Sequence, residues 1–130
     1  LRVKADEVEL ARVISNLIEN ARRYGKSPNS NITELTITAK AEGSVVHLQI
    51  YDRGNGIAEE HLPLIFDRFY RVDTNRSRES GGTGLGLAIC QDIMHAHNGE
   101  IDVQSIVGKE TTFFIRFPMM TTVKTVTKNQ

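Results

Sequence analysis

Apolar side chains near the start of the chain recur every three or four residues, which is the repeat of one face of an α-helix. They are Leu10, Val13, Ile14, Leu17, Ile18 and Ala21. Asp6 is a suitable N-cap, and Gly25 followed by Pro28 ends the pattern, so we predict a helix from Asp6 to Tyr24. The remaining face of this helix is polar and carries Arg12, Asn16, Asn20 and Arg23, with Tyr24 at its border.

Alternating apolar and polar residues predict strands over Leu35 to Ala41 and Val45 to Asp52, and the short turn between them predicts a hairpin. Because successive side chains of a strand point to opposite faces, Asp52 shares its face with the apolar residues of its own strand. These are Val46, Leu48 and Ile50. The pattern therefore places a carboxylate on the core-facing side of a strand end.

In the second half of the chain a helix is again followed by a hairpin. Gly84 to Ala96 has helical apolar spacing, and two further strands, Glu100 to Ile106 and Thr111 to Phe117, flank a turn at Gly108. The helices are few and the strands come in antiparallel pairs. This combination predicts a two-layer α/β sandwich, with helices on one face of a mixed sheet.

Weaker patterns fill the remaining segments. Glu59 to Phe66 predicts a short helix, and Leu1 to Lys4 an edge strand. The polar connection from Phe66 to Gly84 is too long for a routine loop, which indicates a lid or a disordered segment. The polar tail, residues 121–130, is expected to be disordered, which leaves one domain over residues 1–120.

Composition excludes several classes of protein. The 16 Lys and Arg residues balance 16 Asp and Glu residues, whereas a nucleic-acid-binding protein usually has a basic excess. Cys90 is the single cysteine, so no internal disulfide is possible. No apolar run approaches the roughly 20 residues that span a bilayer. Any site for an anion must therefore be built locally.

Three groups of residues suggest such a site. Asn16 and Asn20 are four residues apart on one helix face, where amide oxygens suit Mg²⁺ and Arg23 suits a phosphate; the alternative is a solvated helix face. Asp52 precedes a loop with glycines at positions 54 and 56, which lets backbone approach a flat ring; the alternative is a turn capped by its own aspartate.

The third group is the glycine-rich run Gly81 to Leu87, which leads into a helix N-terminus. Free backbone N–H groups and the helix dipole favour an anion there, and the alternative is a hinge without a ligand. The spacing differs from the dinucleotide-binding fingerprint, and no strand leads into the run. A P-loop spacing is also absent from the sequence.

Taken in order, these runs resemble the four boxes of histidine kinases. Asn16 to Tyr24 resembles the N box, Asp52 to Ile57 the G1 box, Ile65 to Arg71 the F box, and Gly82 to Ala88 the G2 box. The resemblance covers about Asp6 to Pro118. The chain is thus similar to the catalytic ATP-binding domain of a bacterial two-component sensor histidine kinase.

That resemblance implies the Bergerat fold, an α/β (α+β) two-layer sandwich with a mixed, largely antiparallel sheet of about five strands and about three helices. It also implies a flexible ATP lid over residues 66–84, with ATP and Mg²⁺ as cofactors. Asn20 would coordinate Mg²⁺ and Arg23 would contact phosphate, and these are the two residues expected to be catalytic. Asp52 would accept a hydrogen bond from the adenine amino group, and Gly56 would leave room for the ring.

The same resemblance implies the other contacts. Phe66 and Phe69 would anchor the base of the lid, and one of Arg71, Arg76 and Arg78 would reach the γ-phosphate unless all three are solvated. The residues expected to bind ATP are Asn16, Asn20, Arg23, Tyr24, Asp52, Gly54, Gly56, Ile57, Phe69, Tyr70, Arg71, Gly82, Thr83, Gly84, Leu85, Gly86, Leu87 and Thr111.

Two departures from the family pattern matter. Glu110 stands where the family often has a glycine, which weakens the expectation that this turn supports the site. The four histidines, at positions 47, 61, 95 and 97, all lack the helical context of a phosphoacceptor and are interpreted as structural or surface residues. The chain alone is therefore expected not to autophosphorylate.

Asn16 separates the chain from related ATPases. Gyrase-type and chaperone ATPases place a glutamate four residues before the Mg²⁺-binding asparagine, and an amide is no general base. The resemblance thus implies transfer of the γ-phosphoryl group to a histidine of a separate dimerisation and phosphotransfer domain. The alternatives are a hydrolytic ATPase module of the gyrase or chaperone type and a degenerate nucleotide-binding interaction module.

Partners and location follow from the same resemblance. They are the protein's own phosphotransfer domain and, indirectly, a response regulator, with no nucleic acid. The fragment is expected to be monomeric, because no long heptad pattern is present, within a homodimeric parent. It is expected to be a cytoplasmic domain of a protein anchored in the bacterial inner membrane.

Overall fold

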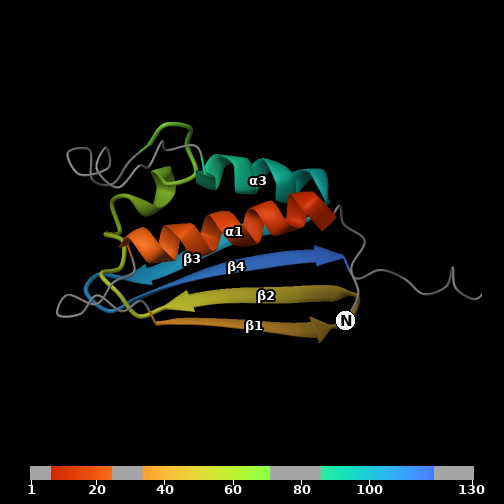
Figure 1. Ribbon diagram of the computed structural model, residues 1–130, viewed down its shortest axis with the longest axis horizontal. Coiled ribbons are helices and arrows are strands. Elements are labelled where there is room, and N and C mark those ends of the chain that lie inside the picture. The colour runs from red at the N-terminus through yellow and green to blue at the C-terminus, as the bar shows by residue number, and fades with distance from the viewer. Residues whose placement is uncertain (1–6, 25–33, 71–85, 119–130) are drawn as a thin grey trace, which may run out of the picture.

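The computed structural model of the chain describes residues 7–24, 34–70 and 86–118. Its elements are α1 (Glu7–Tyr24), β1 (Leu35–Glu42), β2 (Val45–Asp52), the 3-10 turn η1 (Leu62–Leu64), α3 (Gly86–Ala96), β3 (Glu100–Ile106) and β4 (Glu110–Pro118). Both α-helices lie on the same face of the sheet (Figure 1). The predicted two-layer sandwich is therefore confirmed.

The sheet has the strand order β1-β2-β4-β3, so β4 lies between β2 and β3. The two hairpins therefore meet where β2 pairs with β4. All three strand pairs are antiparallel. The largely antiparallel sheet is confirmed, and no parallel pair occurs among these four described strands. The edge strand expected over Leu1 to Lys4 lies outside the described residues.

The core forms between the helices and the inward face of the central strands. The helix α1 contributes Val13 and Leu17, both with no exposed surface, at the spacing that the apolar pattern predicted. Along β4, every second side chain is buried, as expected for a strand with one face toward a core. Cys90 of α3 is also fully buried, and its Sγ donates to the Val13 carbonyl oxygen at 3.7 Å.

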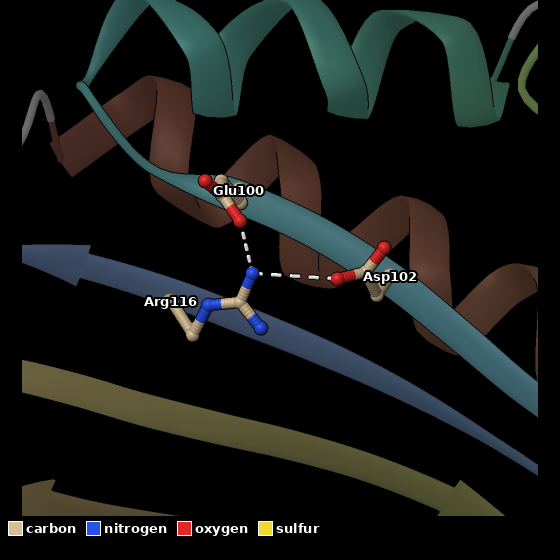
Figure 2. Close-up of polar contacts among 3 residues, drawn as sticks. All are labelled: Glu100, Asp102 and Arg116. Carbon is tan, nitrogen blue, oxygen red and sulfur yellow. Dashed lines mark hydrogen bonds and ion pairs between the residues drawn. The ribbon is translucent and has the colours of Figure 1, made fainter.

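The opposite face of the sheet carries polar side chains together with a few apolar ones. There Arg116 of β4 forms ion pairs with Glu100 and Asp102 of β3 (Figure 2). Glu100 lies directly across from Arg116 in the register, and Asp102 is its diagonal neighbour on the same face. Arg116 alternates with the inward-facing residues of β4, so this cluster is separated from the core by the sheet itself.

The segment between β2 and the lid differs from its prediction. The helix expected over Glu59 to Phe66 is a single 3-10 turn, Leu62–Leu64, within a series of turns. Pro63 lacks a backbone N–H and cannot donate within a helix, which favours this irregular path. Of the expected lid, Phe66 to Tyr70 are described and the rest lies outside the described residues, as does the tail. None of the described helices is long and apolar enough to cross a membrane.

Candidate functional site

Asp52, at the end of β2, is a buried carboxylate that lacks a complete set of partners. Its side chain is 5% exposed, and its Oδ1 is the one buried side-chain oxygen or nitrogen in the described ranges without a hydrogen-bond partner. Burial raises the pKa of this carboxyl to about 6. An orphaned buried acceptor is costly unless a ligand supplies a donor, so Asp52 marks a candidate binding site.

Thr111 of β4 lies directly across from Asp52 in the sheet register. With 4% exposure, it is the other buried polar side chain among the described residues. Cross-strand partners on one face have Cβ atoms roughly 5 Å apart. The Thr111 hydroxyl lies 2.7 Å from the hydroxyl of Ser105 on β3. Three strands thus place polar groups at the same end of the sheet.

The loop after Asp52 is hydrogen-bonded to β3 and to the turn between β3 and β4. The amide of Ile57 donates to Ser105 Oγ at 2.7 Å, and the amide of Gly108 donates to the Asn55 carbonyl at 2.6 Å. Gly54 is buried in this loop, and Ile57 joins the core with 9% exposure. The glycine-punctuated loop is therefore held in place on both sides of Gly56.

Gly56 is required by the packing of the loop itself. Its φ is +72°, and a β-carbon there would lie 2.3 Å from the Ile106 carbonyl oxygen. The position that a β-carbon would occupy is filled by backbone of Ile106 and Val107, and the room for an adenine ring expected at Gly56 stays a prediction. Glycine is needed because two backbones approach closely in a left-handed conformation.

The two asparagines of α1 share one helix face, and Asn16 contacts α3. Both Asn16 and Asn20 are half-buried. Asn16 Nδ2 donates to the Gly86 carbonyl oxygen at 3.4 Å, which joins α1 to the first residue of α3. Arg23 and Tyr24 belong to the last turn of α1, and their predicted side-chain contacts lie outside the described residues. The N box and the end of the G2 box are therefore brought together.

Three contacts hold the described start of the lid. The ring of Phe66 packs edge-on against Phe113, with centroids 6.4 Å apart, and the Tyr70 hydroxyl forms a hydrogen bond with His61 Nδ1. Arg68 also pairs with Asp92 of α3 at 2.6 Å. These contacts confirm the anchoring role expected of Phe66.

Phe69 does not anchor the lid base, and that expectation was wrong. Phe69 is 70% exposed and has a φ of +68°, whereas Phe66 and Tyr70 are half-buried. At the far end of the lid, Gly86 and Leu87 are half-buried at the start of α3. Five other predicted ATP-binding residues lie outside the described residues: Arg71, Gly82, Thr83, Gly84 and Leu85.

Glu110, which stands where the family often has a glycine, makes two contacts at this end of the sheet. Its carboxylate accepts a hydrogen bond from the Tyr51 hydroxyl at 3.0 Å, on the outer face of the sheet. Its backbone oxygen accepts from Ser105 Oγ at 2.9 Å. The turn therefore contributes through its backbone. Sequence reasoning missed Ser105, whose only signal was a polar residue on the inward, otherwise apolar face of β3 (Ile101 and Val103).

Comparisons with known proteins fit this arrangement. The family model for histidine kinase-, DNA gyrase B-, and HSP90-like ATPases matches residues 5–121. Sensor protein SrrB of Staphylococcus aureus is 49% identical over 113 residues, which cover 87% of this chain and 19% of that protein. The chain therefore spans about a fifth of the length of the curated relatives it matches.

Solved structures give the same result. The catalytic domain of histidine kinase ThkA, free of nucleotide, has a TM-score of 0.73 at 29% identity, covering 90% of this chain and 70% of that one. The mycobacterial sensor histidine kinase MprB has a TM-score of 0.75 at 25% identity, with coverages of 90% and 76%. Full-length ShkA in complex with AMPPNP has a TM-score of 0.73 at 29% identity, with coverages of 90% and 23%.

Proposed function

Because the chain belongs to the family of histidine kinase-, DNA gyrase B-, and HSP90-like ATPases, we propose that it binds Mg-ATP and delivers the γ-phosphoryl group to a histidine of a separate dimerisation and phosphotransfer domain. It is a histidine kinase-type ATPase domain whose relatives are sensor kinases. The chemistry of its own residues supports the choice of nucleotide and the destination of the phosphoryl group.

The observation that carries the proposal is the orphaned Oδ1 of Asp52. The exocyclic amino group of adenine is a donor of the right kind for a carboxylate acceptor, and a hydrogen bond to a charged group contributes more than a neutral one. The fastened loop over Gly54 to Ile57 and the buried Thr111 provide a rigid edge next to it. These features support adenine as the base bound there.

The polar face of α1 supports the phosphate end of the site. Mg²⁺ prefers oxygen ligands and keeps several waters, so one amide oxygen from Asn20 together with phosphate oxygens suits it. Bound there, Mg²⁺ would neutralise charge on the triphosphate during transfer. Arg23, three residues beyond Asn20, is proposed to contact phosphate, and the backbone N–H groups leading into α3 to hold it.

Transfer to a histidine is favoured over hydrolysis by the state of Asn16. Its amide nitrogen donates to the Gly86 carbonyl oxygen, and an amide cannot accept a proton from water at neutral pH. A neutral imidazole is already nucleophilic and needs less help from a base. We therefore assign the domain to phosphotransfer within a two-component system.

The rest of the pathway extends this proposal. The acceptor histidine would lie in a dimerisation domain of the same parent protein, and a response regulator would receive the phosphoryl group next. The domain would act in the cytoplasm, as part of a homodimeric parent anchored in the inner membrane.

Binding of a fluorescent ATP analogue, titrated with and without Mg²⁺, tests the proposal. We expect the wild-type chain to bind and Mg²⁺ to strengthen binding. In Asn20→Ala the Mg²⁺-dependent gain in affinity falls by about tenfold, which corresponds to about 1.4 kcal/mol. Asn20→Asp retains an oxygen ligand and is expected to retain the Mg²⁺ dependence.

Arg116→Ala is the matched control, because Arg116 lies on the outer face of the sheet (Figure 2), and it should bind the analogue as the wild type does. Failure of the wild type to bind, or an unchanged Mg²⁺ effect in Asn20→Ala, would show that the assignment is wrong. Steady release of phosphate from ATP by the chain alone would favour a hydrolytic ATPase instead.

A further inference from the structure

The hydroxyl of Ser105 contacts two other segments of the chain, one 48 positions away in the sequence and one five to six positions away. It accepts a hydrogen bond from the amide of Ile57 at 2.7 Å and donates to the Glu110 carbonyl oxygen at 2.9 Å. It also lies 2.7 Å from Thr111 Oγ1. One side chain on β3 thus contacts the loop after β2 and the first two residues of β4.

Counting protons fixes the direction of the third contact. A serine hydroxyl has one proton and two acceptor lone pairs. The Glu110 carbonyl is an acceptor only, so it takes the Ser105 proton, and the Ile57 amide is a donor, so it takes one lone pair. The remaining lone pair requires Thr111 to donate its own proton to Ser105.

Thr111 consequently has no proton left for a ligand. Its Oγ1 retains only lone pairs, and it lies directly across the sheet from Asp52. Both buried polar side chains at this end of the sheet therefore present acceptors. A pair of acceptors matches a ligand edge that carries N–H donors, either directly or through a water that donates to both.

We propose that Ser105 is a positioning residue for nucleotide recognition: it fixes Thr111 as an acceptor beside Asp52 and holds the Ile57 amide in the adjoining loop, so that the site selects a purine with a 6-amino group. The proposal rests on the proposed function, since it assigns a specificity device to the same site. Ser105 itself need not touch the ligand.

The test compares ATP with its 6-desamino analogue, purine riboside triphosphate, which has the same phosphates but lacks the amino group. For the wild-type chain we expect tighter binding of ATP. In Ser105→Ala the preference for ATP over the analogue falls by about three- to tenfold, because Thr111 regains a free proton and no longer acts only as an acceptor. A merely structural loss would weaken both ligands equally and leave the ratio unchanged.

Two further variants test whether the effect of Ser105 on nucleotide preference passes through Thr111. Ser105→Thr keeps the hydroxyl at a strand position that suits threonine and should restore the wild-type ratio. In a Thr111→Val background, Ser105→Ala should change the ratio much less, because the effect passes through Thr111. An unchanged ratio in Ser105→Ala, or an equally large change in the Thr111→Val background, would overturn the proposal.

Hydrogen exchange of the Ile57 amide separates this proposal from the proposed function. Exchange of the unliganded protein should be slower in the wild type and in Ser105→Thr than in Ser105→Ala. If wild type binds ATP but neither the exchange rate nor the ratio changes, the role of Ser105 is refuted while the proposed function survives. If wild type binds no nucleotide, both are refuted, whatever the exchange rates show.

Discussion

Replacing Asp52 with asparagine should stabilise the unliganded domain while weakening its binding of ATP. In the free protein Asp52 is 5% exposed and has an unpartnered carboxylate oxygen, and burial raises the pKa of this carboxyl from its ordinary value of 3.8 to about 6. A pKa raised this far corresponds to a cost to the folded state of about 3 kcal/mol at neutral pH. The amide has nearly the same shape and carries no charge, although its own N–H groups need partners. We expect a gain of about 1–3 kcal/mol in the free energy of unfolding.

The pH dependence of this gain has a definite sign. Below about pH 4 the carboxyl is protonated in both folded and unfolded states, so it contributes no penalty. Between about pH 4 and pH 6 the unfolded state ionises first, and wild-type stability falls as the pH rises through the folded pKa. Denaturant unfolding of both proteins from pH 4 to pH 8 should show a difference that grows across this window and is then constant. An Asp52→Asn protein less stable than wild type at pH 7 would contradict the account.

The same substitution, Asp52→Asn, should lower the affinity for ATP while it raises stability. Hydrogen bonds to charged groups contribute about 1.5–3 kcal/mol, so ATP affinity should fall by roughly ten- to a hundredfold. Titration with the fluorescent analogue at pH 7.5 measures this, with Arg116→Ala as the control. A residue kept for folding would lose stability on substitution, whereas a residue kept for a ligand loses affinity. The opposite signs therefore distinguish the two roles.

Gly56→Ala should be among the most damaging single substitutions in the described part of the chain. Its φ of +72° disfavours any residue with a β-carbon, and the added atom would meet the Ile106 carbonyl oxygen at 2.3 Å. We expect a loss of about 2–4 kcal/mol in the free energy of unfolding, because both backbone strain and a backbone clash must be relieved. The loop carrying the Ile57 amide would shift away from β3, so ATP binding should fall as well.

Gly43→Ala provides a matched control. Gly43 has a similar φ of +63°, but a β-carbon there would have no atom within 4 Å, and the residue lies in the turn between β1 and β2. Gly43→Ala should lower the free energy of unfolding only by the cost of a left-handed backbone at alanine, about 1 kcal/mol. Nucleotide binding should be unchanged. Denaturant unfolding of the two variants separates these contributions. Equal losses at the two positions would show that the close approach at Gly56 is unimportant.

Local patterns were enough to predict most of the architecture. The two hairpins and both helices were predicted from apolar spacing, and the strand period alone placed Asp52 on the buried face. These features follow from interactions between near neighbours in the sequence. The sandwich itself then follows from the need to bury one helix face against one sheet face.

What could not be predicted depends on contacts between distant segments. The Ser105 hydroxyl meets Ile57, which is 48 positions away in the sequence, and the Gly56 requirement comes from the Ile106 backbone. The resemblance to the F box assigned Phe69 to the lid base, but in the structure it is 70% exposed with a φ of +68°. Spacing in a sequence carries no record of such long-range packing.

The central claim is that the unpaired oxygen of Asp52 receives the nucleotide base, and titration of its carboxyl carbon by NMR tests this most directly. In the free protein we predict a pKa near 6. With a saturating non-hydrolysable ATP analogue and Mg²⁺, the pKa should fall by roughly one unit or more, because a donor then stabilises the charged form. A free-protein pKa near 4, or a pKa that does not change at saturation, would contradict the account.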